Sequence, residues 1–222
     1  MDYIFKVAHI PVDGGNRTGI KSKKTSFTVH NTDNTATDEQ EAKNLGRVDN
    51  YSDVGFHYVC DENSVTETIP PYEIAYHCGN VYGNYHSVSL EIACRPGAEE
   101  VAIEFISDYF IQNNWNIDVL TTHKEWNGKN CPSQILPHWD KFRAKIIKMI
   151  QEKRSDNLKT IVTYLGDADV FAALVVSQKN KCPLMLKADY DTSGLIAERI
   201  IMIGGKPGST RFTTFKDAAL LV

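Results

Sequence analysis

The sequence predicts an α/β protein with two regions: a mixed central sheet flanked by helices, followed by a small α/β unit. In the first region a helix is expected around 100–114, and the strand-like segments are 25–30, 55–60, 65–69 and 87–93. In the second region strands alternate with helices. Both patterns allow sheet and helices to pack in layers around a hydrophobic core.

A further helix is predicted at the end of the first region, because apolar residues recur there at three- and four-residue spacing. These residues are Trp139, Phe142, Ile146, Ile147 and Ile150. Polar residues at 153–157 end the pattern. We therefore place a domain boundary there and predict one domain over residues 1–153 and a second over 158–222.

The second domain is predicted to contain three strands and two helices. The strands are 161–165, 183–186 and 200–203, and the helices are 170–178 and 192–199. Strands that alternate with helices run parallel and are joined by right-handed crossovers. A unit of about 65 residues is marginal for a lone domain. A homo-oligomer formed through this domain would relieve the shortage of core.

The composition excludes several classes of protein. Of 222 residues 42% are hydrophobic and 23% charged, as in soluble globular proteins. No apolar run is long enough to cross a bilayer and no N-terminal signal is visible, so a cytoplasmic location and no membrane partner are expected. The net charge of −4 is not that of a nucleic-acid-binding protein. Five cysteines without disulfide-framework spacing suggest reduced thiols.

Two histidines and a cysteine form a candidate metal site. His30 closes the strand-like segment 25–29, and His123 and Cys131 stand on one short connection. Two imidazoles and one thiolate would leave tetrahedral Zn²⁺ an open position for water, which is typical of catalysis, whereas a closed structural site needs a fourth ligand. The eight-residue spacing requires a turn at Asn127-Gly128 that brings both donors together. The alternative for His30 is a core histidine with a backbone partner.

The segments 27–32 and 126–132 resemble the metal-binding motifs of zinc-dependent N-acetylmuramoyl-L-alanine amidases. The branch is the one shared by phage lysins, phage T7 lysozyme and peptidoglycan recognition proteins. Segments 55–61, 75–79 and 87–92 resemble the intervening strands of that family in the right order. The resemblance covers about residues 1–153 and implies that His30, His123 and Cys131 bind zinc and that the amide between N-acetylmuramic acid and L-alanine of peptidoglycan is cut.

The resemblance also implies roles for three further residues. Glu91 would be the general base, and the alternative is a buried ion-pair partner. Lys129 would stabilise the oxyanion, and the alternative is a solvated surface lysine. His77 would contact the substrate, and the alternative is a structural histidine. The other histidines, His9, His57, His86 and His138, are given no role in the site.

The tail resembles the cell-wall-binding repeat of clostridial surface proteins and lysins. The similar segments are 166–174, 180–186, 201–205 and 211–214. This chain holds one copy, whereas that family usually carries several in tandem, which again suggests a homo-oligomer. The expected protein is a phage or prophage endolysin that stays in the host cytoplasm until release, and the alternative is a host autolysin, which would need an export route. Its tail would then bind a secondary polymer of a Gram-positive, clostridial wall and hold the enzyme near its substrate.

Two other functions stay open at this point. The chain could be a peptidoglycan recognition module that binds without cleaving, although such binders typically lack the cysteine ligand, and Cys131 is present. It could also be another zinc amidohydrolase, one that acts on anhydro-muropeptides during recycling. The wall-binding tail argues against a soluble substrate of that kind.

Overall fold

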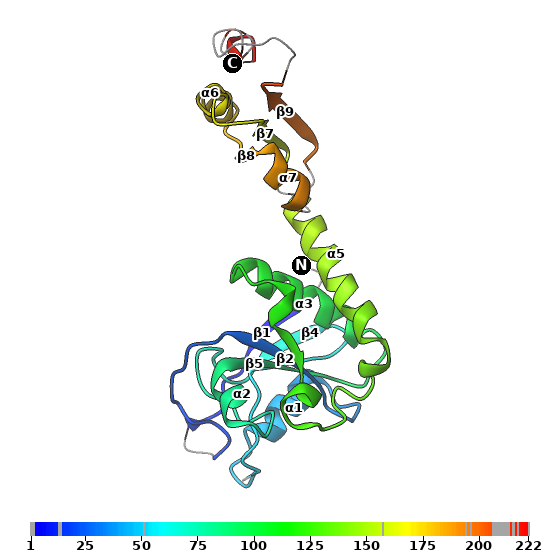
Figure 1. Ribbon diagram of the computed structural model, residues 1–222. Coiled ribbons are helices and arrows are strands. Elements are labelled where there is room, and N and C mark those ends of the chain that lie inside the picture. The colour runs from blue at the N-terminus through cyan, green and yellow to red at the C-terminus, as the bar shows by residue number, and fades with distance from the viewer. Residues whose placement is uncertain are drawn as a thin grey trace. The chain divides into compact units, whose positions relative to one another are not determined.

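The computed structural model describes residues 3–221 except 13–14, 51, 157, 194, 196, 206–213, 215 and 217 (Figure 1). The chain divides into two compact units, Met1–Ile147 and Lys148–Val222, and each is described by itself. Residues 211–213 of the last expected tail segment lie outside the described residues. Among the residues described, no helix is long and apolar enough to cross a membrane.

A mixed six-stranded sheet forms the centre of the first unit. Its strands are β1 (Ile4–Val7), β2 (Ser26–Asn31), β3 (Tyr58–Cys60), β4 (Ser64–Glu67), β5 (Ser87–Ile92) and β6 (Leu120–Thr122). Their order across the sheet is β1-β4-β3-β5-β2-β6. Only β3 and β4 pair antiparallel, and every other pair is parallel. The predicted mixed sheet is therefore confirmed.

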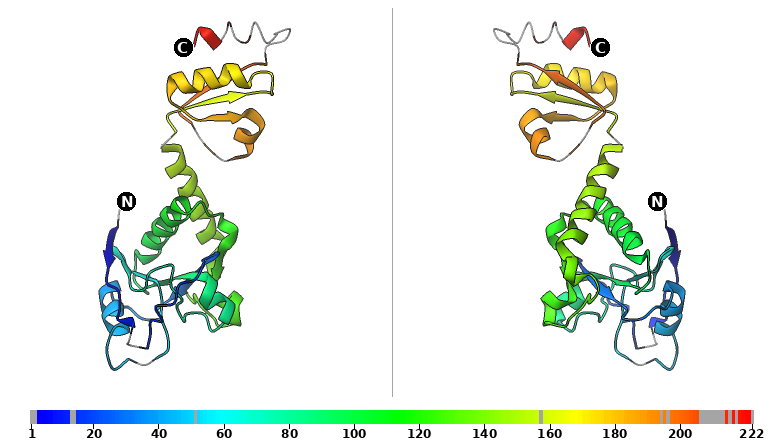
Figure 2. Two further views of the ribbon diagram at one scale, coloured as in Figure 1. Left: turned by 90° about the vertical axis from the view of Figure 1, so that its left-hand side faces the viewer. Right: turned by 90° about the vertical axis from the view of Figure 1, so that its right-hand side faces the viewer.

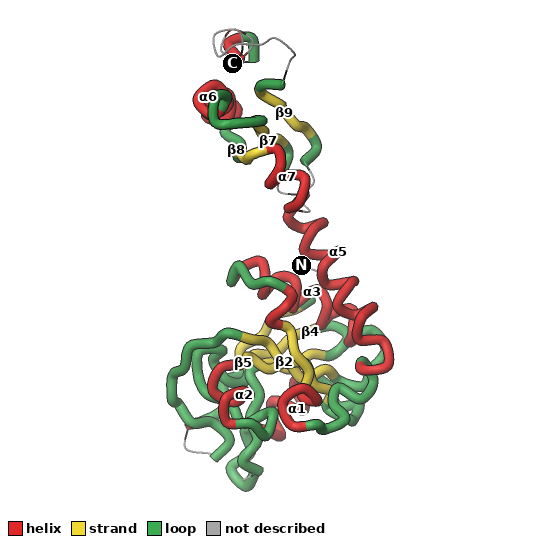
Figure 3. The backbone as a smooth tube through the Cα atoms, viewed as in Figure 1, coloured by secondary structure: helices red, strands yellow, loops and turns green. Residues whose placement is uncertain are grey.

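Helices cover both faces of this sheet. They are α1 (Asp38–Leu45), α2 (Val81–His86), α3 (Ala98–Gln112), α4 (His123–Asn127) and α5 (Trp139–Asp156). Figure 3 shows the sheet with α3 and the N-terminal part of α5 on one side and α1 and α2 on the other. The predicted helices around 100–114 and through Trp139 are α3 and α5.

Strand β2 lies between β5 and the edge strand β6, and it has an apolar face and a polar face. Successive side chains of a strand point to opposite faces of the sheet. Phe27, fully buried, packs its ring 5.8 Å from that of Phe110 on α3. Thr28 and His30 therefore lie on the other face, away from α3.

The neighbouring strand β5 repeats this division, and the two strands are in register over their full length, from Ser26↔Ser87 to Asn31↔Ile92. Its alternate residues Val88 and Leu90 are fully buried apolar side chains. Ser89 and Glu91 lie on the same polar face of the sheet as Thr28 and His30 of β2. Two adjacent strands thus present polar groups on one buried face, which is where the candidate site lies.

The second unit contains a three-stranded parallel sheet, as predicted, and helices α6 and α7 lie between its strands in the chain. Its elements are β7 (Thr160–Tyr164), α6 (Val170–Asn180), β8 (Leu184–Leu186), α7 (Lys187–Ser193) and β9 (Arg199–Ile203). The strand order is β8-β7-β9 with both pairs parallel. Figure 2 shows α6 along one face of the sheet and α7 on the other side. Val162, Ala173, Val176 and Ile201 belong to its buried core.

The prediction of a helix over 192–199 is wrong. Helix α7 begins at Lys187 and ends at Ser193, and the described residues 195, 197 and 198 are not helical. The helix thus begins before the predicted segment. An ion pair from Lys187 to Asp191 stabilises its first turn, since residues four apart are neighbours on a helix. The hydroxyl of Ser193 accepts a hydrogen bond from the backbone N–H of Leu195 and so ends the helix locally.

The predicted strand 55–60 is also too long, because β3 begins only at Tyr58. The backbone N–H of His57 donates to the side-chain hydroxyl of Ser89 on the neighbouring strand β5 instead of to a backbone carbonyl of that strand. Strand β4 likewise ends at Glu67, two residues before the end of the predicted segment 65–69. The N–H of Thr68 bonds the carbonyl of His57 at this corner, at 2.8 Å.

Candidate metal centre

His30 is held near the end of strand β2. Its side chain is 1% exposed and lies on the polar face of the sheet. Thr28, two residues earlier on this face, accepts a hydrogen bond from the indole Nε1 of Trp126 on α4 at 2.8 Å. The hydroxyl of Thr28 also lies 2.5 Å from that of Ser87 on β5. These bonds fasten α4 and β5 to the strand that carries His30.

The helix α4 positions His123 as its first residue. Its N-terminus carries a capping box, in which the Thr122 hydroxyl accepts from the N–H of Glu125 and the Glu125 carboxylate accepts from the N–H of Thr122. The helix ends at Gly128, which has a φ of 84° and so takes the left-handed conformation that favours glycine. The predicted turn at 127–128 is therefore the end of a short helix.

Beyond Gly128 the chain returns alongside α4. The N–H of Lys124 donates to the carbonyl of Cys131 at 3.0 Å, which closes the loop and sets the Cys131 thiol beside His123. The Cys131 side chain is 2% exposed and that of His123 is 6% exposed. This backbone hydrogen bond therefore brings together two buried donors, His123 and Cys131, that are eight residues apart in the sequence.

The three predicted ligands converge on one point. Nδ1 of His30 lies 3.0 Å from Nδ1 of His123 and 3.7 Å from Sγ of Cys131. One donor atom from each residue lies within 4.8 Å of the others. Zinc bonds of about 2.0 Å to nitrogen and 2.3 Å to sulfur imply ligand separations of roughly 3.3 and 3.6 Å in a tetrahedron. The observed separations therefore fit a zinc ion.

The protonation of the donors also fits a cation. Burial, together with nearby His123 and Lys129, holds the pKa of His30 well below its usual value. Burial and Lys129 lower the pKa of His123. Both rings are thus neutral, as ligands must be. Burial raises the pKa of the Cys131 thiol to about 11, so this thiol requires a neighbouring cation to ionise near neutral pH.

Glu91 projects from β5 toward the same point. Its Oε1 lies 3.8 Å from Nδ1 of His30, and the side chain is 16% exposed. Burial raises the pKa of Glu91 to about 8, and the positive charge of Lys129 acts in the opposite direction. A carboxyl with a pKa near the working pH can both accept and return a proton.

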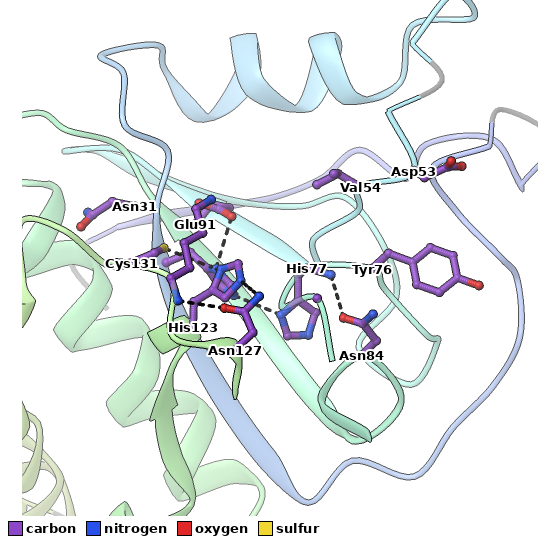
Figure 4. Close-up of a pocket in the computed structure, with 13 residues that line it drawn as sticks. Asn31, Asp53, Val54, Tyr76, His77, Asn84, Glu91, His123, Asn127 and Cys131 are labelled. Carbon is purple, nitrogen blue, oxygen red and sulfur yellow. Dashed lines mark hydrogen bonds and ion pairs between the residues drawn. The ribbon is translucent and has the colours of Figure 1, made fainter. Parts of the chain in front are cut away.

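The site opens into a groove of about 560 Å³. Figure 4 shows Glu91, His123 and Cys131 gathered at one end, with Asp53, Val54 and Tyr76 at the other. Lys129 lines the groove and is exposed. A volume of this size is ordinary for a small-molecule site.

His77 also lines the groove, but most of its ring is buried, at 6% exposure. Its Nδ1 lies 3.0 Å from Nε2 of His30, the ring nitrogen that faces away from the three donors. The backbone N–H of His77 donates to Oδ1 of Asn84. His77 thus meets a metal-ligand candidate directly, which its predicted role as a substrate contact did not include.

Sequence reasoning gave no role to several groups that shape the site. Asn84 fixes the chain at His77 and Cys78 through its Oδ1, which accepts both backbone N–H groups at 3.0 Å. The amide of Asn127 lies 3.1 Å from Nε2 of His123, on the side away from the donors. The Asn80-x-x-Gly83 cap that opens α2 is a sequence signal that could have drawn attention to this segment.

The remaining histidines lie away from the donor atoms. His57 is fully buried, with its Nε2 donating to the carbonyl of Glu73 and its Nδ1 accepting from the N–H of Ser89. His9 and His138 contact the carboxylates of Glu67 and Glu99 at 2.6 and 2.8 Å.

Together, the fold and the donor set define an α/β protein with a candidate three-ligand metal site on the polar face of its mixed sheet. The chain belongs to the N-acetylmuramoyl-L-alanine amidase family (Amidase_2), whose sequence profile matches residues 21–134. All three candidate metal ligands lie within the matched segment.

Individual relatives agree with this assignment. The chain is 33% identical over 134 residues to the N-acetylmuramoyl-L-alanine amidase XlyB of Bacillus subtilis, covering 55% of this chain and 42% of the relative. It is 30% identical over 212 residues to the N-acetylmuramoyl-L-alanine amidase CwlA of a Bacillus species, covering 86% of this chain and 80% of the relative. A solved mutant endolysin from Bacillus subtilis has a TM-score of 0.61 and 30% identity, over 65% of this chain and 99% of that one.

The matches differ in how much of each relative they include. The chain spans about half the length of the first curated relatives, with shares from 42% to 57%. The match to the Bacillus CwlA extends over most of both chains.

Proposed function

We propose that this chain is a zinc-dependent amidase that hydrolyses the bond between N-acetylmuramic acid and L-alanine in peptidoglycan. The observation that carries the proposal is the convergence of His30, His123 and Cys131, with Glu91 3.8 Å from the His30 ring. Membership of the amidase family supports the choice of bond.

Zinc bound by this set would supply a Lewis acid that polarises the amide carbonyl and acidifies a water molecule. Oε1 of Glu91 takes a proton from the attacking water and later delivers it to the nitrogen of L-alanine as that amine leaves. The raised pKa of Glu91 suits both transfers, because the same carboxyl must gain and lose a proton in each cycle.

Lys129 is proposed to stabilise the negative charge on the carbonyl oxygen during the attack. It lines the groove, and its positive charge acts on His30, His123 and Glu91. A cation already in place costs no reorganisation when charge develops, which makes this kind of stabilisation large.

A binder that does not cleave would need no general base beside the metal ligands. Glu91 is the residue that distinguishes the two functions, because a carboxyl group on a buried strand face is costly to keep unless it is used or hydrogen-bonded. Its position in register with His30 therefore favours hydrolysis over recognition alone.

The test is digestion of purified clostridial peptidoglycan with and without a chelator, followed by mass spectrometry and labelling of new ends. New L-alanine amino termini that disappear on chelation and return with zinc would support the amidase. New reducing sugar ends would show that a different bond is cut. Retained wall binding without any cleavage would favour the recognition module.

The tail, residues 158–222, is proposed to bind a secondary polymer of a Gram-positive, clostridial wall. In this proposal the chain is an endolysin that acts on the wall after release from the host cytoplasm. The match to the Bacillus CwlA supports the link, since it extends over 86% of this chain and therefore beyond the amidase segment. Pelleting of the full chain with clostridial walls, but not of a chain ending at Lys153, would support this role.

Self-association through the second unit belongs to the same proposal. The unit exposes apolar side chains on two elements: Phe171 and Val175 on α6 are 68% and 49% exposed, and Ile200 and Met202 on β9 are 47% and 53% exposed. Burial of such residues against a second copy would enlarge a small core. Sedimentation of the full chain tests this, and a monomer at all concentrations would contradict it.

A further inference from the structure

The buried ring of His77 stands behind His30, on the opposite side from the metal donors. The rings are nearly perpendicular, at 88° with centroids 5.1 Å apart, and Nε2 of His30 meets Nδ1 of His77 at 3.0 Å. This is hydrogen-bond distance between two ring nitrogens. One of the two nitrogens must donate, and the chemistry of the site decides which.

The direction of this bond follows from the position of the donor atoms. Nδ1 of His30 faces both His123 and Cys131 and is therefore the nitrogen available to a metal ion. A neutral imidazole that binds metal through one nitrogen carries its proton on the other. The Nε2–H of His30 must then donate, and Nδ1 of His77 must accept.

The surroundings of His77 hold it in this acceptor role. Its backbone N–H is anchored by Asn84, and its ring lies at 69° to that of His57, with centroids 6.0 Å apart. His57 cannot compete for the bond, since Glu73 and Ser89 already use both of its ring nitrogens. Nε2 of His77 is buried with no hydrogen-bond partner among the described residues. Within that same set of residues, the bond to His30 is thus the polar contact of the ring.

We propose that His77 is a positioning residue for the metal site: its Nδ1 accepts the Nε2–H of His30 and fixes the ring plane and tautomer in which His30 binds the ion. The inference rests on the proposed function only in taking the three donors as a zinc site. Partners of this kind are commonly carboxylates, carbonyls or water, and their removal typically lowers metal affinity by about 10–100-fold.

The test compares three variants that differ in which ring nitrogen they replace. In His77→Asn the amide oxygen can stand where Nδ1 stands, so the acceptor is kept. In His77→Gln the amide group reaches the position of Nε2 and the acceptor is lost. His77→Phe keeps a ring without either nitrogen. Zinc dissociation constants of the full-length variants are measured by competition with a chromophoric chelator, and the Co²⁺-substituted proteins are compared by visible absorption.

We expect His77→Gln and His77→Phe to weaken zinc binding by about 10–100-fold and His77→Asn to stay within about threefold of the wild type. The Co²⁺ spectrum should change in the first two variants alone. Equal zinc affinity in all four proteins would overturn the proposal. A larger loss in His77→Asn than in His77→Gln would also overturn it, because a merely structural histidine is replaced worst by the smaller side chain.

Two controls distinguish a loss of zinc affinity caused by the missing hydrogen bond from a loss of folding stability and from a failure of the proposed function. Urea unfolding of the metal-free variants measures the stability of each, so that a loss of zinc affinity with unchanged stability is assigned to the hydrogen bond. Zinc affinity is measured without peptidoglycan. A wild-type protein that binds zinc but cuts no amide would therefore refute the proposed function and leave the role of His77 intact.

Discussion

His30 on β2 and Glu91 on β5 are register partners on neighbouring parallel strands, and the Nδ1 of one lies 3.8 Å from the Oε1 of the other. A candidate metal ligand and the proposed general base are thus fixed by the backbone hydrogen bonds of one sheet. Sites built on strands hold their geometry more tightly than sites on loops. These two residues form the rigid portion of the candidate site. Helix α4 and the loop after it contribute the other two candidate ligands, His123 and Cys131.

Replacing Glu91 by glutamine should separate metal binding from catalysis. The amide keeps the shape of the side chain but accepts no proton from water, so we expect kcat to fall by about 10²–10⁴-fold. Zinc content should be unchanged. Glu41→Gln is the matched control, because Glu41 is an acid close enough to influence Glu91 but does not line the groove. Release of L-alanine ends measures kcat, and an active Glu91→Gln enzyme would refute the base assignment.

Lys124 on helix α4 and Lys129 in the loop that follows it make a second matched pair. Both are exposed, but only Lys129 lines the groove. Lys129→Met should lower kcat by about 10²–10³-fold through loss of oxyanion stabilisation, whereas Lys124→Met should leave kcat near the wild-type value. The comparison uses steady-state digestion of soluble muropeptides. Equal effects of the two substitutions would mean that Lys129 acts only as a surface charge.

Removing a ligand should abolish metal binding and activity together. In Cys131→Ser a hydroxyl replaces the thiolate, and kcat/KM is expected to drop on the order of 10³-fold, because Lewis-acid catalysis contributes several kcal/mol to the barrier. Elemental analysis of the purified variant should find little zinc. Cys60→Ser is the control, since Cys60 is also buried but is not among the three donors. Full zinc content in Cys131→Ser would contradict the ligand assignment.

The cap of α4 gives a stability prediction. Thr122→Ala removes the hydroxyl that accepts the N–H of Glu125 at 3.2 Å, and it should lower the free energy of unfolding by about 1 kcal/mol. Thr122→Ser keeps the capping oxygen and should retain most of that stability. Urea denaturation of both variants measures the difference. Identical unfolding midpoints of the two variants would show that the capping box does not stabilise helix α4.

Because His57 is buried, we predict that the folded state loses stability in acid. Burial, assisted by nearby Lys24, lowers the pKa of His57 from 6.5 to about 3. As the pH falls from 6.5 toward 3 the unfolded chain takes up a proton here and the folded chain does not. Stability is therefore complete above pH 6.5 and declines within that window, by at most about 1.4 kcal/mol per pH unit from this residue.

The check is to measure unfolding free energies of the metal-free wild type and of His57→Gln at several pH values within the window. The other groups are common to both proteins, so the difference in slope isolates this histidine. The wild type should show the steeper decline. Parallel curves would mean that His57 is protonated in the folded state.

The longer elements of the fold were predictable because their hydrophobic patterns extend over many residues. Strands β2 and β5 and helices α3 and α5 all appear close to the expected segments. The short helices α1 and α4 were missed, although both had a signal in the sequence: Thr37-x-x-Gln40 and Thr122-x-x-Glu125 are both capping boxes. The predicted position of α7 was wrong, because the helix begins at Lys187, where an ion pair to Asp191 that the pattern did not include spans its first turn.

In the candidate site, the ligand set was predictable from residue type, and the structure brings its three members together. The contact between His77 and His30 was not predictable. These residues are 47 positions apart, and the contact depends on the path of the chain at Asn84 and on the buried packing of His57. Pattern and motif identify the chemical types at a site, whereas the contacts between its histidines arise from packing.

The metal donors are distant in sequence: His30 is 93 residues from His123 and 101 from Cys131. A chain that has not folded cannot bring them together, so an ion that binds all three binds the folded state alone. At a free zinc concentration of 100 times the dissociation constant, such linkage adds about 2.7 kcal/mol to stability. Depletion of zinc would then abolish activity and also lower the stability of the fold. The unfolded fraction would rise, and proteases would cleave the chain more readily.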